Sequence, residues 1–520
     1  MSLLILLGMT SPTPGQRLSQ GVVGTTALER AGLEMVWQTH VTVDPSRGGI
    51  THVTPDINVT NTETVFHVEY AGEHKTFAAG QRDARGRTID QQGAGRLAEV
   101  EVQVLAKQGI EATITETVTP DVTLYVQTDQ GMIEALDAET GVNRWTLSPG
   151  NPAYPNMAPS ANDRFTAIVN GSTLYLYDMA ESKLAWKRQL RGAPGAGAIV
   201  SEEFVFAPLL NGRVVMKSLT DERRPVRRLS SAGRAMVQPT VTPRSLAWPT
   251  DLGYLYVANV QTGNQRFRHR IGSTISSRVV YLPPDWLVVV STDGFVQCVH
   301  EIRGSIQWRF STGERVVQSP LAIDDSVYVA TDYGSLFRLD SQNGVEQWHI
   351  HGIREVLSAT KDRVYARDAT GNLVVISSES GDELARVPLA HMNLSVVNDL
   401  TDRIYIGTRN GRLLCLREIG QELPQLHQSA RRELDQQQVS AAGAADAATP
   451  DEGPTEEPTL DDSSEEPEDS FFDENDANPF APGAGANPFA PAEEMRDDAG
   501  EDIPADDASE DDGNPFAVDF

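Results

Sequence analysis

Cysteine is almost absent from this sequence: its 520 residues include two, Cys298 and Cys415. They lie far apart in the chain, so we expect two small buried apolar side chains rather than a disulfide bridge. Two isolated cysteines do not indicate a redox compartment.

Long apolar runs are absent as well. The run Leu3 to Leu7 is too short to span a bilayer and shorter than the apolar region of a signal peptide. Residues 1–30 are therefore either the remnant of a signal peptide that begins upstream or an ordinary terminal segment. We expect no transmembrane span.

Basic residues are scarce at one end of the chain. Residues 421–520 contain 29 Asp and Glu against 3 Lys and Arg, whereas the other 420 residues hold 44 acidic and 40 basic residues. Nucleic-acid binding is disfavoured, because a phosphate backbone requires a basic surface. The segment 421–520 also has few large apolar residues, which predicts a disordered acidic tail.

The chain does contain a repeat. Residues 122–145 (VTLYVQTDQGMIEALDAETGVNRW) and 325–348 (DSVYVATDYGSLFRLDSQNGVEQW) share a pattern of strand, glycine turn, strand, second turn and a strand bearing tryptophan. The first turn glycine recurs every 37 to 41 residues, at Gly131, Gly171, Gly212, Gly253, Gly294, Gly334, Gly371 and Gly411. Such a period is typical of β-propellers, whose small sheets must stack to bury their faces.

A large side chain follows each turn glycine by fourteen or fifteen positions in five of the units. These residues are Trp145, Trp186, Phe267, Trp308 and Trp348. Units three and seven depart from the pattern, with Val226 or Arg227 and Ala385 or Arg386 at that place. We expect the aromatic rings to pack across neighbouring strands.

The motif VYV-x-T-x-x-G-x-L-x-x-LD-x-x-x-G-x-x-x-W resembles the pyrroloquinoline-quinone-type (PQQ) propeller repeat of quinoprotein dehydrogenases and of the outer-membrane assembly protein BamB. The resemblance implies eight blades. We therefore expect an all-β fold: an eight-bladed β-propeller in residues 121–420, closed by an N-terminal strand, with a small α/β insertion and a disordered acidic C-terminal tail in residues 421–520. Because such folds host both enzymes and scaffolds, the resemblance alone does not fix a function.

The N-terminal part predicts both the closing strand and the insertion. Residues 31–44 read as a strand around Trp37, and unit eight lacks a tryptophan strand of its own. We expect this strand to complete unit eight and remove a free sheet edge. In the insertion, residues 45–120, we expect a hairpin at 65–77 around Ala71-Gly72 and a helix at 93–109.

The tail repeats one short motif, NPFA, three times. Its residues are Asn478, Pro479 and Phe480; Asn487, Pro488 and Phe489; and Asn514, Pro515 and Phe516. Asn-Pro-Phe resembles the peptide that eukaryotic EH domains bind. The copies are either multivalent partner-binding anchors or compositional drift in a low-complexity segment.

A second candidate site is basic. Units three and four carry Arg223, Arg224, Arg227, Arg228, Arg266, Arg268 and Arg270. The last three alternate, so we expect them to share one strand face. The cluster is either an ordinary charged surface or a site for an anionic group, supplied by a partner or by the protein's own tail.

Motifs for catalysis are missing: the chain has no nucleophile elbow, P-loop or dinucleotide fingerprint. The adjacent cysteine pair of quinoprotein alcohol dehydrogenases is missing too, and we identify no catalytic or metal residue. We expect a monomeric, non-catalytic scaffold that binds proteins and needs no cofactor, in the cell envelope or periplasm. The alternatives are a PQQ-dependent oxidoreductase with calcium, a propeller that binds a small ligand, and a cytoplasmic location.

Overall fold

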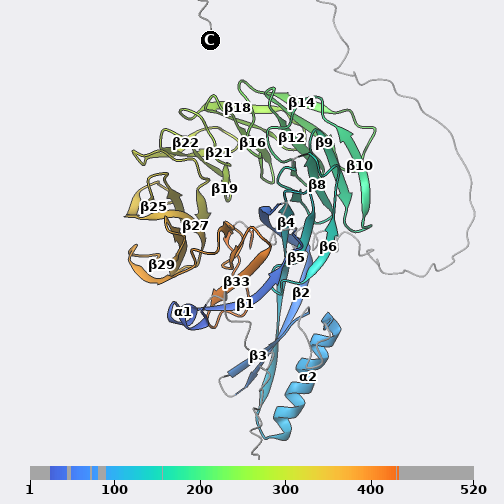
Figure 1. Ribbon diagram of the computed structural model, residues 1–520, viewed down its shortest axis with the longest axis vertical. Helices are drawn as coiled ribbons and strands as arrows, with labels where there is room; N and C mark the ends of the chain where they lie inside the picture. The colour runs from blue at the N-terminus through green and yellow to red at the C-terminus, as the bar shows by residue number, and fades with distance from the viewer. Residues whose placement is uncertain are drawn as a thin grey trace, which may run out of the picture. The chain divides into compact units, whose positions relative to one another are not determined.

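The computed structural model describes residues 24–43, 48–70, 73–79, 89–154, 156–428 and 430–431. These residues form eight β-sheets, seven with four strands and one with five, together with the helices α1 (Thr25–Arg30) and α2 (Gln91–Lys107). The predicted β-propeller is confirmed, and Figure 1 shows its sheets arranged around a centre. The NPFA motifs and residues 1–23 lie outside the described residues.

The sheets follow the repeat units. The first has the order β3-β2-β4-β5-β6 and the last has β1-β33-β32-β31, while the others each hold four consecutive strands. The first sheet comprises β2 (Ile50–Tyr70), β3 (Glu73–Phe77), β4 (Ala112–Thr128), β5 (Ile133–Asp137) and β6 (Asn143–Leu147). The second and third comprise β7 (Ser160–Ala161), β8 (Phe165–Asn170), β9 (Thr173–Asp178), β10 (Lys183–Gln189), β11 (Ile199–Val200), β12 (Phe204–Leu209), β13 (Arg213–Ser218) and β14 (Arg227–Ser230).

The remaining five sheets have the following bounds. The fourth and fifth comprise β15 (Thr240–Val241), β16 (Ser245–Pro249), β17 (Tyr254–Asn259), β18 (Gln265–Arg270), β19 (Val280–Leu282), β20 (Trp286–Val290), β21 (Phe295–His300) and β22 (Ile306–Ser311). The sixth and seventh comprise β23 (Leu321–Ile323), β24 (Ser326–Ala330), β25 (Ser335–Asp340), β26 (Glu346–His351), β27 (Ile353–Ala359), β28 (Arg363–Asp368), β29 (Leu373–Ser377) and β30 (Glu383–Val387). The eighth comprises β31 (Leu394–Ser395), β32 (Ile404–Gly407), β33 (Arg412–Glu418) and β1 (Leu33–His40).

Each repeat folds around its first turn glycine. Gly334 joins β24 to β25 with a φ of +87°, a left-handed conformation that side chains other than glycine rarely adopt. The strand β24 before the turn is buried along its whole length. Neighbouring sheets therefore cover both faces of the inner strands, as in other stacked sheets.

Outer-strand tryptophans join one sheet to the next. The Trp308 indole Nε1 donates a hydrogen bond to the Ser341 carbonyl oxygen at 2.9 Å, and its ring lies against Gly344, where a Cβ would come within 2.5 Å of it. Trp186 and Trp348 donate in the same way to the carbonyls of Leu219 and Ser378. The aromatic residues of the repeat therefore stabilise the contacts between sheets.

Unit three replaces this tryptophan by an arginine. The Arg227 guanidinium donates to the Thr262 carbonyl and, at 3.1 Å, to Asn264 Oδ1, both in the turn of the next sheet. Arg227 Cζ lies 3.7 Å from the Cβ position of Gly263 in that turn. The change from tryptophan to Arg227 therefore preserves a hydrogen-bonded contact between this sheet and the next, because a guanidinium is a hydrogen-bond donor like the indole N–H.

The N-terminal strand closes the propeller. β1 pairs antiparallel with β33, which places Trp37 opposite Cys415. Trp37 Nε1 then donates to the Ala138 carbonyl of the first sheet at 2.9 Å. Trp37 shares a hydrophobic cluster with Leu124 and Leu136 of that sheet. The predicted role of residues 31–44 in closing the fold is therefore present in the structure.

An extension of the first sheet contains the predicted helix and hairpin. β2 pairs with β3, and the turn residues 71 and 72 lie outside the described chain. α2 begins after Asp90, whose side chain accepts a hydrogen bond from Gly93 N at 2.7 Å. Its Ala98 and Leu105 pack with Val68 of β2. Residue 120, expected as the end of the insertion, lies inside β4, because one continuous strand serves both parts (Figure 1).

Candidate binding surfaces

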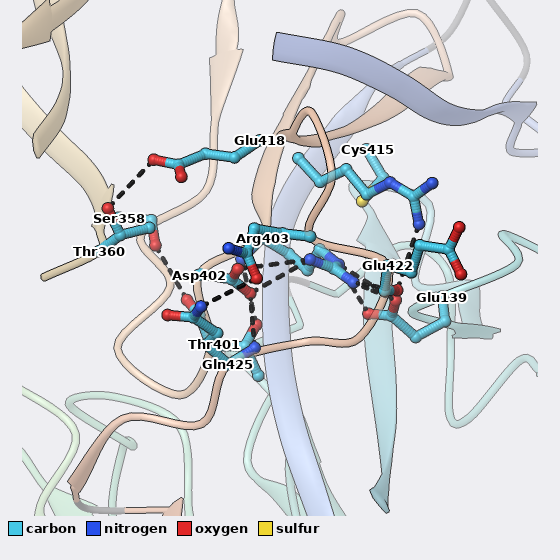
Figure 2. A network of polar contacts seen from close by, with 12 residues as sticks. Glu139, Ser358, Thr360, Thr401, Asp402, Arg403, Cys415, Glu418, Glu422 and Gln425 are labelled. Carbon is cyan, nitrogen blue, oxygen red and sulfur yellow. Dashed lines mark hydrogen bonds and ion pairs between the residues drawn. The ribbon is translucent and has the colours of Figure 1, made fainter. Parts of the chain in front are cut away.

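The first and last sheets meet around the fully buried side chain of Arg403. Its Nε donates to both carboxylate oxygens of Glu139, at 3.2 and 3.1 Å, and Nη2 donates to Glu139 Oε2 at 3.0 Å. Nη1 pairs with Asp402, and Nη2 also donates to the Glu422 carbonyl at 2.9 Å. Figure 2 shows this guanidinium between the three acceptors. We call Glu139, Asp402, Arg403 and Trp37 the closing joint.

Burial governs the electrostatics of the closing joint. It would lower the pKa of Arg403, but the carboxylates of Glu139 and Asp402 raise that pKa above its usual range. Burial also raises the pKa of the Glu139 and Asp402 carboxyls, against the opposing effect of Arg403. A buried charge without a partner is costly, so these groups depend on one another. The joint is a structural element, and its polar groups are satisfied from within the chain.

The chain after β33 folds back on this joint. The Gln425 amide donates to Asp402 Oδ1 at 2.9 Å, and the His427 amide donates to the Leu400 carbonyl at 2.9 Å. His427 and Ala430 are buried. The tail was expected to begin at residue 421. These contacts show that the packed part of the chain extends beyond residue 421. The boundary was placed too early because the acidic composition averaged over 421–520 does not reveal this short packed segment.

Two cavities lie beside the first sheet. One, of about 540 Å³, lies between β1, the extension and residues 422–424, and its lining includes Trp37, Val65 and Arg417. The other, of about 190 Å³, lies between the first two sheets and is lined by Tyr125, Trp145 and Arg144, among others. Arg144 pairs with Asp121 and Asp137, and Arg417 pairs with Glu34. The basic side chains of both cavities therefore already have carboxylate partners.

The predicted basic cluster lies on and beside the outer strands β14 and β18 of neighbouring sheets. We call its members the arginine surface: Arg223, Arg224, Arg227, Arg228, Arg266, Arg268 and Arg270. All are exposed except Arg266, which is half-buried. β14 and β18 are adjacent at the outside of the propeller (Figure 1). Each is the terminal strand of its sheet.

Aromatic rings support three of these arginines. The guanidinium carbons of Arg268 and Arg270 lie 5.3 and 5.9 Å from the Tyr254 ring centroid. Arg224 lies 4.7 Å from the Phe204 ring centroid. An aromatic face attracts a cation without using its hydrogen-bond donors. Donors of these three side chains therefore stay available to a further group.

The expected common face of Arg266, Arg268 and Arg270 is wrong for Arg266. The pairing of β18 with β17 shifts between Gln265 and Phe267, so the alternation is interrupted at Arg266. Its guanidinium donates instead to Ser245 Oγ and the Arg244 carbonyl, both at 3.0 Å. Arg268 and Arg270 remain together over Tyr254.

Carboxylates of the described residues form no ion pair with the arginine surface. None of its seven side chains forms an ion pair with a carboxylate in the described part of the chain, whereas nearby Arg234 pairs with Asp251 at 2.7 Å. The surface is therefore a concentration of arginine side chains that make no ion pair with a carboxylate of the described residues.

Lys217 holds part of this surface in place, a role that no local sequence pattern predicted. Its buried ammonium donates to the carbonyls of Asp221, Glu222 and Arg224 at 2.7, 2.9 and 3.1 Å. Burial lowers the pKa of Lys217. Three carbonyl acceptors fix the loop that carries Arg223 and Arg224.

The two cysteines lie in different sheets and are buried. Burial raises the pKa of Cys298 to about 12 and raises that of Cys415 well above its usual value. Among the residues that the structure describes, no group of three or more His, Cys, Asp or Glu side chains is placed to hold a metal ion. No described helix combines the length and apolar character needed to cross a membrane.

Comparisons with known proteins found one family model and several solved structures that are similar to this chain. The family model described as "Outer membrane protein assembly factor BamB" matches residues 79–236 and 251–446. BamB from Moraxella catarrhalis is 14% identical, with 57% of this chain and 93% of that chain covered and a TM-score of 0.48. The computationally designed Ika8 protein is 14% identical, with 56% and 92% covered and a TM-score of 0.45. Hsv2 from Kluyvelomyces marxianus is 12% identical, with 49% and 88% covered and a TM-score of 0.38. No curated protein sequence matches the chain.

Proposed function

The chain belongs to the family of the outer membrane protein assembly factor BamB, and from this we propose that it is a non-catalytic β-propeller scaffold that binds other proteins in the cell envelope. The family match over residues 79–236 and 251–446 is the observation that carries the proposal. The closing joint is compatible with the proposal, because the ion pairs of Arg403 with Glu139 and Asp402 join the last sheet to the first and so stabilise the ring. A rigid ring presents its loops and outer strands at fixed positions, which lowers the entropy cost of binding a partner.

The NPFA motifs extend this proposal to the tail. Phe480, Phe489 and Phe516 each stand in an acidic segment with few other aromatic residues. An isolated aromatic side chain next to Asn-Pro suits a small apolar pocket on a partner. Three weak contacts on one chain bind together more tightly than each alone, because the second and third become intramolecular.

A pull-down from native lysate tests both parts of the proposal. The baits are the whole protein, the protein that ends at residue 431, and the whole protein with Phe480, Phe489 and Phe516 changed to alanine. The matched control changes the other three tail phenylalanines, Phe471, Phe472 and Phe520, to alanine. This control removes the same number of aromatic rings and leaves the motifs intact.

The outcomes separate the propeller from the tail. Partners that bind the whole protein and the control, but neither altered bait, assign recognition to the NPFA motifs. Partners that bind all four baits assign it to the propeller. Failure of every bait to retain a protein would overturn the scaffold proposal.

A further inference from the structure

Charge is unevenly distributed over the outer strands of the propeller. The strands β10, β14, β18 and β22 contain no acidic residue, and they carry Lys183, Lys187, Arg188, Arg227, Arg228, Arg266, Arg268, Arg270 and Arg309. The strands β26, β30, β1 and β6 carry Glu346, Glu383 and Glu34 against Arg386 and Arg144. One side of the outer surface is therefore positive and the other is nearly balanced.

The arginine surface is the centre of the positive side. Arg268 and Arg270 are both exposed and both lie over Tyr254. They stand two residues apart on a strand, so their side chains follow the strand at intervals of about 6.6 Å. Alternate carboxylates of an extended peptide have the same spacing. A guanidinium and a carboxylate can also form two parallel hydrogen bonds.

The arginine surface is elongated along the outer strands β14 and β18. Arg270 pairs with Tyr254, next to the turn glycine of its sheet, whereas Arg227 pairs with Met216 and reaches the second turn of the following sheet. The arginines are thus spread along both strands instead of being gathered at one point. Among the described strands, the outer edge of each of these two strands pairs with no other strand, and such an edge can accept the backbone of an added strand.

We propose that the arginine surface binds an acidic polypeptide segment in an extended conformation, with its carboxylates paired to Arg224, Arg268 and Arg270. This inference rests on the proposed protein-binding function and names the chemistry of one partner. A nucleic acid fits less well, because the chain outside the tail is slightly acidic as a whole and a phosphate backbone requires a wide basic surface.

The test uses the whole protein and a fluorescent twelve-residue peptide of alternating Glu and Ser, with a Gln-Ser peptide as the uncharged control. Fluorescence anisotropy is measured for wild type and for Arg224→Gln/Arg268→Gln/Arg270→Gln. The matched control variant is Arg30→Gln/Arg354→Gln/Arg409→Gln. It removes three other exposed arginines that pair with no carboxylate in the described chain.

The surface variant should bind the Glu-Ser peptide about tenfold more weakly, because each exposed charge pair contributes modestly. The control variant should stay within about twofold of wild type, and the Gln-Ser peptide should not bind. Raising NaCl from about 50 to about 500 mM should weaken wild-type binding, because salt screens exposed charges. Equal losses in both variants, or no binding by wild type and by the chain ending at residue 431, would overturn the inference.

Competition identifies other occupants. If inorganic phosphate or phosphatidylglycerol vesicles displace the peptide at lower concentration than glutamate polymers do, the surface prefers phosphate and the inference is wrong. If the chain ending at residue 431 binds the peptide more tightly than the whole protein does, and the surface variant abolishes the difference, the protein's own acidic segment competes and the inference stands. If the peptide binds but the pull-down retains no partner, only the scaffold proposal is contradicted. If the pull-down retains partners but the peptide does not bind, only this inference is contradicted.

Discussion

Arginine occupies two contrasting environments in this protein. In the closing joint, Arg403 is fully buried, and Glu139, Asp402 and the Glu422 carbonyl satisfy it. On the arginine surface, Arg268 and Arg270 are exposed, rest on Tyr254 and have no carboxylate partner in the described chain. The first arrangement stabilises the fold, whereas the second leaves donors available for a partner. Burial and pairing, rather than residue type, distinguish the structural arginine from the arginines of the proposed binding surface.

Removal of residues 1–44 should have the largest effect on the closing joint. The deletion takes away β1 with the buried Leu28, Leu33, Trp37 and Val41, and it exposes the edge of β33. We expect a destabilisation larger than any single substitution causes, together with aggregation. Thermal unfolding and light scattering measure it, with the chain that begins at residue 24 as the control. An unchanged melting temperature would show that β1 does not close the propeller.

Arg403→Leu should come next. It leaves the carboxylates of Glu139 and Asp402 without their buried partner, which costs about 3–5 kcal/mol of unfolding free energy. Urea denaturation measures the loss. Arg403→Leu/Glu139→Leu should recover part of the stability, because it removes one uncompensated charge. Equal stability losses for Arg403→Leu and for the exposed Arg268→Leu would contradict the contrast between the two regions.

Trp37→Ala should loosen the closing joint locally and expose Cys415, which lies opposite Trp37 on β33. In the native protein neither thiol should react with iodoacetamide at pH 8, because burial raises both pKa values and keeps the thiols protonated. In the variant, Cys415 should be alkylated before Cys298, as mass spectrometry of peptides will show.

Trp145→Ala is the matched control for this experiment. The Trp145 indole is half-buried and donates to no acceptor among the described residues. Its removal should leave both cysteines unreactive. Faster labelling of Cys298 than Cys415 after Trp37→Ala would argue that the propeller opens at a different joint.

The smallest effect on stability is expected at the arginine surface. Arg268→Gln/Arg270→Gln should unfold within about 0.5 kcal/mol of wild type, because exposed charges without partners contribute little. Urea denaturation of this variant, of Arg403→Leu and of wild type measures the three unfolding free energies. A loss comparable to that of Arg403→Leu would mean that the two side chains hold the fourth sheet together.

Local pattern predicted most of the fold but little of the chemistry of its joints. The roles of the turn glycines and of Trp308 could be predicted because each repeat places these residues at a fixed spacing. The ion pair between Arg403 and Glu139 could not be predicted, because the two residues are 264 positions apart and neither belongs to the repeat motif. Likewise, the sequence pattern shows Arg227 only as a departure from the repeat. Its hydrogen bonds to the next sheet, which replace those of the tryptophan, are evident only in the structure.

The sequence by itself determined the repeating sheets, the closing strand and the presence of a basic cluster. These follow from hydrophobic alternation, turn glycines and charge, which act over a few neighbouring residues. Tertiary structure alone decided which charges are buried and paired, where the pairing of β18 shifts at Arg266, and which arginines lie over an aromatic ring. Those outcomes depend on distances between segments far apart in the chain, and only the closed packing of the sheets sets such distances.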